Sequence, residues 1–171
     1  MQMVKKTVIA LVLLWFALLL FMPKIQLYYL LEHNLAKREI KLNESRISES
    51  PFGLRVTGMQ VYFKGIPIAK IEKTEAVTLL FYNRISTAQI TLDALLKEKF
   101  PASIEKLVFQ YSLIDPLHIH ISGSGSFGTL EGNYDLRAHK LHIDIAAGKD
   151  IGMIGQWLKR GEKGYYYETS F

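Results

Sequence analysis

The hydrophobic pattern of this chain begins with one long apolar run near the N-terminus. The run extends from Thr7 to Met22, follows Lys5 and Lys6, and is separated by Lys24 from a second apolar segment, Ile25–Leu31. As an α-helix it would span about 24 Å, compared with about 30 Å for the hydrocarbon core of a bilayer. A lysine at the membrane surface can extend its ammonium into water, so Lys24 does not prevent the span from continuing. The pattern predicts a membrane-embedded helix.

Three structures are compatible with such a run: an uncleaved anchor, a cleaved secretory signal, or the core helix of a soluble protein. A signal peptidase site needs small residues, and Phe21–Leu31 contains no alanine, glycine or serine. A soluble core helix would need burial on every side, because Val8–Phe21 has no polar face. Tyr28 and Tyr29 would lie where aromatic rings prefer the membrane interface. We predict an uncleaved single-span anchor, with a cleaved signal as the main alternative.

The charges that flank the run are nearly balanced and do not set its orientation. Lys5, Lys6 and the α-amino group precede it, whereas Lys24, Lys37 and Arg38 follow it. A short N-terminal tail followed at once by an apolar segment is typical of a signal anchor, in which the tail stays inside and the remaining chain is exported. We expect this orientation.

The next segment, Ile25–Arg38, has helical spacing and would continue the membrane helix into the aqueous phase. From residue 40 onward the hydrophobic period changes to two, which is typical of strands with one buried face. Leu54 and Val56 alternate with polar residues, and the alternation resumes in the opposite phase at Met59. The slip falls at Thr57-Gly58, where a glycine predicts a β-bulge.

Further alternating segments predict a series of strands joined by short connections. They are Ile40–Asn43, Leu54–Phe63, Val77–Phe81, Ala88–Leu92, Leu107–Leu113, Leu117–Ile121, Phe127–Leu136, Leu141–Ile145 and Tyr165–Phe171, with turns at Glu49-Ser50-Pro51, Lys64-Gly65, Asn83-Arg84 and Ala138-His139-Lys140 and an edge or strand start at Pro67. Two short helices are predicted, Ala94–Phe100 after Asp93 and Asp150–Arg160 before Gly161.

This arrangement lacks the intervening helices of βαβ units and therefore favours an antiparallel meander. The expected fold is mainly β (α+β): a single N-terminal transmembrane helix followed by a curved antiparallel sheet with one or two short helices. We divide the chain into an anchor and juxtamembrane helix, residues 1–38, and a strand-rich domain, residues 39–171.

The net charge of +5 and the pI of about 9.3 suggest a nucleic-acid or acidic-membrane partner at first sight. Lys5, Lys6 and Lys24 account for three of the 21 basic residues, and all 16 acidic residues lie at or after Glu32. The remaining domain therefore carries a net charge of only +2, and its basic residues form no stripe. A nucleic-acid partner is not expected. The absence of cysteine excludes disulfides and thiolate chemistry and is compatible with either redox compartment.

Four histidines are the main candidates for a chemical site. His118 and His120 share one face of a predicted strand, and His139 and His142 follow about twenty residues later, so neighbouring strands could bring four zinc-binding imidazoles together. The alternating apolar residues of the same strand claim the opposite face for the core, which leaves both histidines on a polar face with no need for a ligand. We therefore assign no metal ligand.

The Gly-Ser segment Ser122–Ser126 lacks the lysine and the capped helix of a phosphate-binding loop and is interpreted as a hairpin or bulged strand. Asp115 and Asp144 are interpreted as turn and surface residues, and Asn43-Glu44-Ser45 matches the short glycosylation sequon. We assign no catalytic or cofactor-binding residue and expect a non-enzymatic protein without a cofactor.

Three segments carry a resemblance to known envelope proteins: Ser50–Val61, Gly123–Leu136, and the closing helix followed by Gly164-Tyr165-Tyr166. With the N-terminal anchor and connecting helix, their order resembles the N protein of type II secretion systems and, more distantly, AsmA-like inner-membrane proteins. The resemblance covers most of the chain as a pattern of features.

This resemblance implies a single-pass protein of the bacterial inner membrane, with its N-terminus in the cytoplasm and its C-terminal domain in the periplasm. It implies a scaffold in an envelope-spanning machine of the secretion, pilus or flagellar-motor kind, anchored in membrane lipid and open to oligomeric assembly. Free strand edges would add strands from partner proteins. The alternatives are a lipid-binding or lipid-transfer module and, third, a histidine-dependent metal-binding envelope protein.

Overall fold

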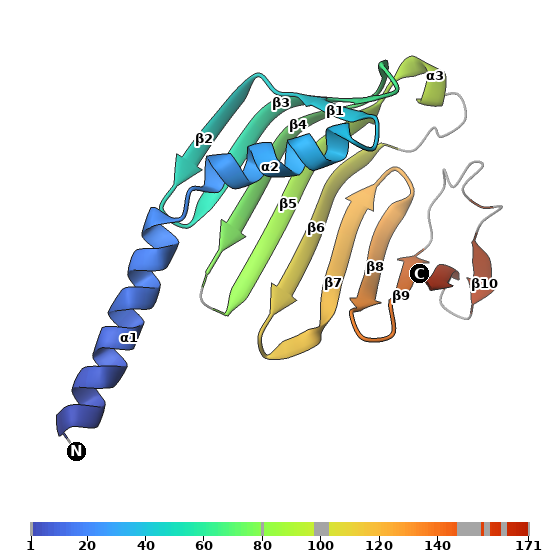
Figure 1. Ribbon diagram of the computed structural model, residues 1–171. Coiled ribbons are helices and arrows are strands. Elements are labelled where there is room, and N and C mark those ends of the chain that lie inside the picture. Colours follow the sequence, from blue (N-terminus) through green and yellow to red (C-terminus); the bar gives the residue numbers. More distant parts are fainter. Residues whose placement is uncertain are drawn as a thin grey trace.

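The computed structural model describes residues 2–79, 81–97, 103–146, 155, 158–161 and 164–170. The chain starts with two helices, α1 (Gln2–Phe21) and α2 (Lys24–Ala36), which meet at an angle (Figure 1). The break falls at Met22 and Pro23, because proline cannot donate a backbone hydrogen bond and disfavours the helical conformation of the residue before it. The expectation that residues 25–38 continue the membrane helix is therefore wrong: they form a separate element.

Helix α1 has the length and the composition of a membrane span. Its 20 residues correspond to about 30 Å at 1.5 Å per residue, its mean hydropathy is 2.2, and Leu19 is its one buried residue. Among the described residues it is the one helix with these properties. A signal sequence near the N-terminus has the same properties.

Strands dominate the remaining described residues, which confirms the mainly β fold with a large antiparallel sheet. They are β1 (Ile40–Asn43), β2 (Arg46–Ser50), β3 (Gly53–Phe63), β4 (Ile66–Thr78), β5 (Tyr82–Leu92), β6 (Ile104–Ser112), β7 (Asp115–Gly125), β8 (Gly128–Asp135), β9 (Lys140–Ala146), β10 (Lys159–Gly161) and β11 (Gly164–Ser170), with the single turn α3 (Ala94–Lys97) between β5 and β6.

All described strands belong to one sheet, and neighbouring strands are antiparallel. The order is β1-β3-β4-β5-β6-β7-β8-β9-β11-β10, and β2 also pairs with β3. Strands β1 and β2 pair with opposite halves of β3 in one register, so together they form a single interrupted edge. The predicted meander is present from β3 to β9. After β9 the order changes, because β11 pairs with β9 and β10 lies at the outer edge of the sheet.

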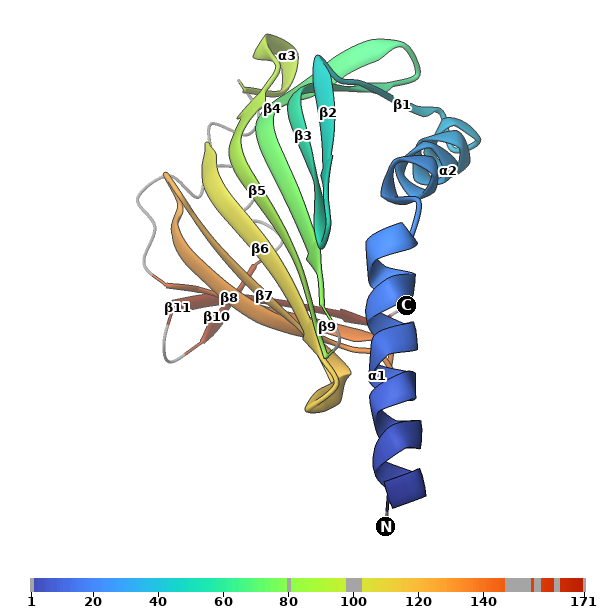
Figure 2. The ribbon, with the colours of Figure 1, turned by 90° about the vertical axis from the view of Figure 1, so that its left-hand side faces the viewer.

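A crease crosses the sheet where the sequence pattern slips in phase. Gly58 in β3 and Gln89 in β5 both have positive φ angles, 63° and 54°, and the register places both opposite Glu72 of β4. On the next strand, the β6–β7 register shifts between Ile104 and Lys106. Beyond this line the ends of β3 and β4 curve toward α2 (Figure 2).

The predicted bulge at Gly58 is only partly correct. Gly58 does reverse the facing of the strand, because Val56 and Met59 are both buried. However, β3 keeps the same register with β4 on both sides of Gly58, and the register shift comes later, between Val61 and Tyr62. A left-handed residue reverses the facing without the extra residue that defines a bulge.

Two other predicted turns need correction. Residues 46–50 form β2, so the turn after them consists of Pro51 and Phe52 rather than Glu49-Ser50-Pro51. Strand β4 ends at Thr78 and β5 begins at Tyr82, so Leu79 and Phe81 belong to their connection and Asn83 and Arg84 lie inside β5. Apolar residues occupy that turn, and periodicity alone cannot distinguish an apolar turn from a strand.

The predicted helix Asp150–Arg160 lies mostly outside the described residues. Its C-terminal end is wrong, since Lys159 and Arg160 belong to β10 and pair with Tyr166 and Tyr165. The predicted helix Ala94–Phe100 is confirmed over α3, and its last residues lie outside the described part. Pro67 lies at the start of β4, as expected.

Candidate functional site under helix α2

An apolar groove of about 330 Å³ lies between α2 and the sheet. Helix α2 crosses the sheet in front of β3, β4 and β5, and it also contacts β1 and β2 (Figure 1). The groove is lined by Met22, Lys24, Leu27, Tyr28, Leu31, Leu42, Gly53, Leu54, Val56, Met59, Thr74, Ala76, Thr78 and Ile85. Leu27 and Leu31 belong to the apolar side that the helical spacing predicts for this segment. Leu42 and Met59, which lie on the other side of the crease from Leu54 and Val56, complete the lining of the groove.

Lys24 is buried at the junction of the two helices. Its Nζ donates hydrogen bonds to the carbonyl oxygens of Leu19 (3.1 Å) and Met22 (3.3 Å), and it lies 3.5 Å from Oε1 of Glu49 on β2. A cation at the C-terminal end of α1 stabilises the free carbonyl groups of that helix. Lys24 therefore fixes the end of α1 against the edge of the sheet, whereas the sequence suggested only a lysine at the membrane surface.

Tyr28 is the main polar side chain that α2 presents to the groove. Its hydroxyl lies 3.3 Å from Oε2 of Glu44 and 3.8 Å from Sδ of Met59. Burial, with the charge of Glu44 in second place, raises the pKa of Tyr28 well above its ordinary value. The phenol therefore remains a hydrogen-bond donor at physiological pH, with Glu44 as its acceptor.

The wall of the groove also contains a buried hydroxyl group. Among the described residues, Oγ1 of Thr74 has no hydrogen-bond partner. A buried hydroxyl without a partner costs free energy relative to a methyl group of the same shape. The groove is therefore apolar apart from four side chains of its lining: Lys24, Tyr28, Thr74 and Thr78.

The groove is one end of a continuous apolar face that crosses the sheet. The strand register places one row of apolar residues across eight strands, from β3 to β11 without β10. The row consists of Leu54, Ala76, Ile85, Phe109, Ile121, Gly132, Ile143 and Tyr167. A parallel row consists of Val56, Thr74, Thr87, Leu107, Gly123, Leu130, Ile145 and Tyr165.

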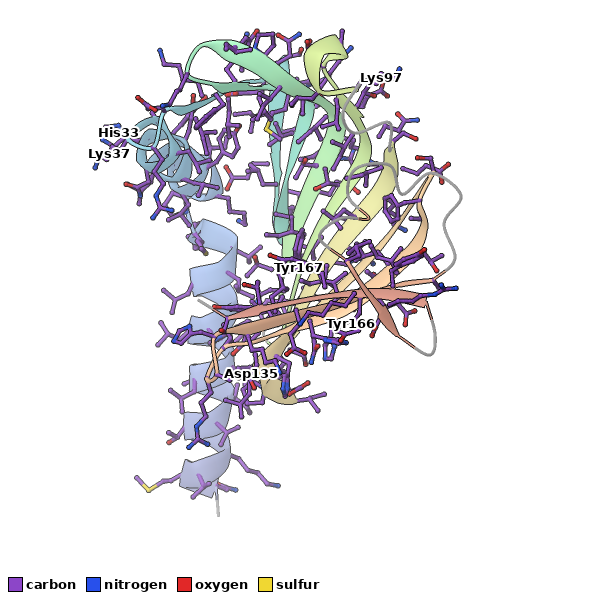
Figure 3. All side chains as sticks on the ribbon, turned by 90° about the vertical axis from the view of Figure 1, so that its right-hand side faces the viewer. His33, Lys37, Lys97, Asp135, Tyr166 and Tyr167 are labelled. Atoms are coloured by element: carbon purple, nitrogen blue, oxygen red, sulfur yellow. The ribbon has the colours of Figure 1, made fainter. Side chains whose placement is uncertain are left out.

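At the end of this face farthest from α2, apolar side chains form a small buried cluster. Phe127, from the β7–β8 turn, and Ile145 are its buried centre, with 7% of each side chain exposed. Leu130, Leu158 and Tyr165 pack against them. Tyr167 belongs to the apolar face and Tyr166 to the opposite one (Figure 3). Between the α2 groove and this cluster Ile121 is buried, whereas Ile85, where the face enters the groove, is 47% exposed.

The four histidines do not come together. His120 and His142 lie in one cross-strand row with Asn133 of β8 between them, so about 9.5 Å of sheet separates their backbones. His118 is 2.7 Å from Asp115, and His139 is 3.3 Å from the hydroxyl of Tyr134. Within the described residues, no group of three or more histidine, aspartate and glutamate side chains is placed to hold a metal ion.

Carboxylates surround these histidines on the polar face. Asp115 contacts both His118 (2.7 Å) and His120 (3.1 Å), and these contacts lower the pKa of Asp115, with the His118 hydrogen bond as the main cause. The same hydrogen bond raises the pKa of His118. His142 lies within 3.3 Å of Glu168 and 3.2 Å of Asp144. These contacts are hydrogen bonds on a partly exposed surface, and they become ion pairs only when the histidine ring is protonated.

Comparison with protein-family models, with curated proteins and with solved structures finds no match to this chain. The geometry of the groove is therefore the main guide to function. Sequence reasoning missed the groove because its two walls, α2 and β3–β5, are separated in the chain. The apolar side of α2 was the one signal that pointed to a packing partner.

Proposed function

We propose that the chain is a membrane-anchored module whose groove under α2 holds an acyl chain of a membrane lipid. The observation that carries this proposal is the position of the groove: apolar residues line it, and it opens beside the junction between α1 and α2. Its volume of about 330 Å³ is in the range of small-molecule sites. The apolar row beyond Ile85 would extend the contact along the chain. This is the second of the three roles considered from the sequence, the lipid-binding or lipid-transfer module.

The proposal includes the uncleaved anchor and the exported orientation of the domain in a bacterial inner membrane. With α1 in the bilayer, the entrance of the groove lies at the membrane surface, where a lipid can move its chain under α2 without crossing water. Lys24 and Tyr28 already donate to Leu19, Met22, Glu49 and Glu44, whereas the hydroxyl of Thr74 in the groove wall has no described partner and could donate to an ester oxygen.

The test is lipid analysis of the full chain purified in a detergent that does not resemble a phospholipid. We expect phospholipid to co-purify at a fixed ratio, and we expect Ala76→Phe to lower that ratio because the ring fills the groove. The matched control is Ala88→Phe, an alanine of the neighbouring strand on the polar face. Equal ratios in the two variants, or no lipid in the unchanged protein, would overturn the proposal.

The scaffold role remains a second candidate, and the free edge formed by β1 and β2 favours it. Strand β2 pairs only with β3 among the described strands, so its outer backbone groups are open to strand addition. A photo-crosslinker at Ser48, in intact cells, is expected to capture one defined partner if this candidate is correct. The same crosslinker at Ser122, on an exposed position in the middle of the sheet, is the control. Equal capture at both positions would reject the candidate.

A further inference from the structure

Large apolar side chains are concentrated on the turns at one end of the sheet. In an antiparallel sheet, alternate turns lie at the same end, so the β2–β3, β4–β5, β6–β7 and β8–β9 turns form one group. The β4–β5 turn exposes Leu79 and Phe81, the β6–β7 turn exposes Leu113 and Ile114, and the β8–β9 turn exposes Leu136. Ile114 is 92% exposed and Phe81 is 58% exposed.

The opposite end has a different character. Its β3–β4 turn consists of Lys64 and Gly65, with the exposed apolar residues Phe63 and Ile66 beside it, and the Lys64 ammonium lies 5.6 Å from the Phe63 ring and pairs with Glu39. Lys97 of α3 also lies at this end, whereas Asp135 at the end of β8 marks the apolar group of turns (Figure 3). The two ends of one sheet therefore face different surroundings.

Helix α1 runs beside the apolar turns. Figures 1 and 2 both place these turns on the side of the sheet toward which α1 descends from α2. The β2–β3 turn contacts the helix directly, with the rings of Phe52 and Phe16 edge-on at 6.0 Å between centroids. Phe16 precedes the end of α1 by five residues, or about 8 Å. This depth matches the 5–10 Å to which apolar groups enter the headgroup and acyl boundary.

We infer that these turns form a second membrane contact, in which the tips of the β4–β5, β6–β7 and β8–β9 turns insert into the bilayer surface beside α1. The occupant is a lipid surface rather than a protein, because the row of tips is continuous with the helix that has the composition of a membrane span. Exposed apolar tips of this size are unfavourable in water and favourable at a lipid interface.

The chemistry around the tips limits the depth of insertion. Tyr82 follows Phe81, Asp115 follows Ile114, and Asp135 and Arg137 flank Leu136, so aromatic and charged groups lie where headgroups and water would meet them. Backbone groups of an open turn cannot enter the hydrocarbon core unpaired. The sheet would therefore stand on the ends of its strands at the membrane surface. The α2 groove would then face the lipid that it receives. This inference rests on the anchor part of the proposed function.

Because the chain has no cysteine, one introduced cysteine can carry a polarity-sensitive fluorophore at a single site. The full chain with Ile114→Cys would be labelled and reconstituted into vesicles of phosphatidylethanolamine and phosphatidylglycerol that contain nitroxide lipids, with the nitroxide either near the headgroup or near the chain end. We expect the label at position 114 to lose most of its emission to the shallow quencher and less to the deep one.

Two further variants make the outcome decisive. Lys64→Cys, at the far end of the sheet, should keep its emission with both quenchers, and Leu13→Cys, in the middle of α1, should lose more emission to the deep quencher. Quenching at position 13 without quenching at 114 overturns the second membrane contact and leaves the anchor intact. Absence of quenching at both positions overturns the anchor as well. Equal quenching at 114 and 64 shows non-specific adsorption and also overturns the inference.

Discussion

The apolar face and the polar face of the sheet use the same strands but are held together differently. On the apolar face, Val56, Ile121 and Ile145 are buried, and the cross-strand neighbours are aliphatic or aromatic. On the polar face, neighbours such as Arg55 and Glu75, with Nε and Oε1 2.7 Å apart, form partly exposed ion pairs. Burial stabilises in proportion to area, whereas exposed ion pairs contribute little. Apart from Val108, which is buried on the polar face, stability should therefore depend mainly on the apolar face and surface chemistry on the polar face.

The largest change in unfolding free energy is expected when a charged residue is introduced on each face in turn. Ile121→Asp buries a carboxylate in the apolar row, and we expect it to cost about 4 kcal/mol or more of unfolding free energy. Ser122→Asp, the next residue of the same strand, places the same charge on the polar face and should change stability by less than about 0.5 kcal/mol. Denaturant unfolding in detergent micelles measures both. Similar losses in the two variants would refute the assignment of the faces.

The crease tests how the apolar face changes sides along β3. An alanine at position 58 would have to keep φ near +63°, and its Cβ would lie 2.5 Å from Oγ of Ser45. We expect Gly58→Ala to cost about 2–3 kcal/mol, since strained backbone conformations cost about 1–3 kcal/mol each.

The matched control is Gly65→Ala, where φ is also positive, at +80°, and no atom lies within 4 Å of the added carbon. This variant should cost only about 1 kcal/mol, the backbone contribution alone. The extra cost at Gly58 should shrink when Ser45→Ala removes the clashing hydroxyl. If the two glycines respond equally, the contact with Ser45 has no energetic role.

A smaller effect of opposite sign is expected from the buried hydroxyl of the groove wall. Thr74→Val replaces a hydroxyl that lacks a described partner by a methyl group, and we expect it to stabilise the fold by about 1 kcal/mol. Thr57→Val removes a hydroxyl that donates to the carbonyl oxygen of Arg46 at 3.4 Å, and it should not stabilise. Thermal unfolding of the two variants in parallel distinguishes them. Loss of stability in Thr74→Val would indicate a bound hydrogen-bond acceptor at this site.

The smallest effect concerns pH and the polar face. The pKa of His118 is raised and that of Asp115 is lowered by their mutual hydrogen bond. A raised histidine pKa contributes stability that is lost as the pH rises through it, and a lowered aspartate pKa contributes stability that is lost as the pH falls through it. The pair therefore stabilises between the two ordinary values, 3.8 and 6.5.

NMR titration of the His118 ring is the direct measurement. We expect its pKa to lie above 6.5 in the unchanged protein and to return toward that value in Asp115→Asn. His139 is the internal reference, because its described contact is with the hydroxyl of Tyr134. A His118 pKa that is insensitive to Asp115→Asn would show that the pair is not formed in solution.

Local patterns in the sequence determined much of this protein. The run without a polar face predicted a helix over Thr7–Met22, and α1 covers it up to Phe21. Alternation predicted most strands, because along most of their length one face is apolar and the other is polar. The phase slip at Gly58 was visible in the same way. These features depend on residues that are near one another in the chain.

Other features were decided only when distant segments met. Whether α2 continues α1 or folds across β3–β5 depends on pairing between residues such as Lys24 and Glu49, which are 25 positions apart. The alignment of Gly58 with Gln89 across Glu72 depends on strand register, which local hydrophobicity does not contain. Phe81 and Leu113 were predicted as the ends of strands, and Ile114 was assigned to no element.

The groove and the row of apolar turns are both properties of this second kind. The sequence alone supplied an apolar helix, a run of alternating strands and a nearly neutral domain. The tertiary structure alone decided that α2 covers one end of the apolar face. It also decided that four turns lie in a row along the end of the sheet toward which α1 descends. The physical reason is that side-chain periodicity is fixed by the backbone of each segment, whereas register and helix docking are fixed by contacts between segments far apart in the chain.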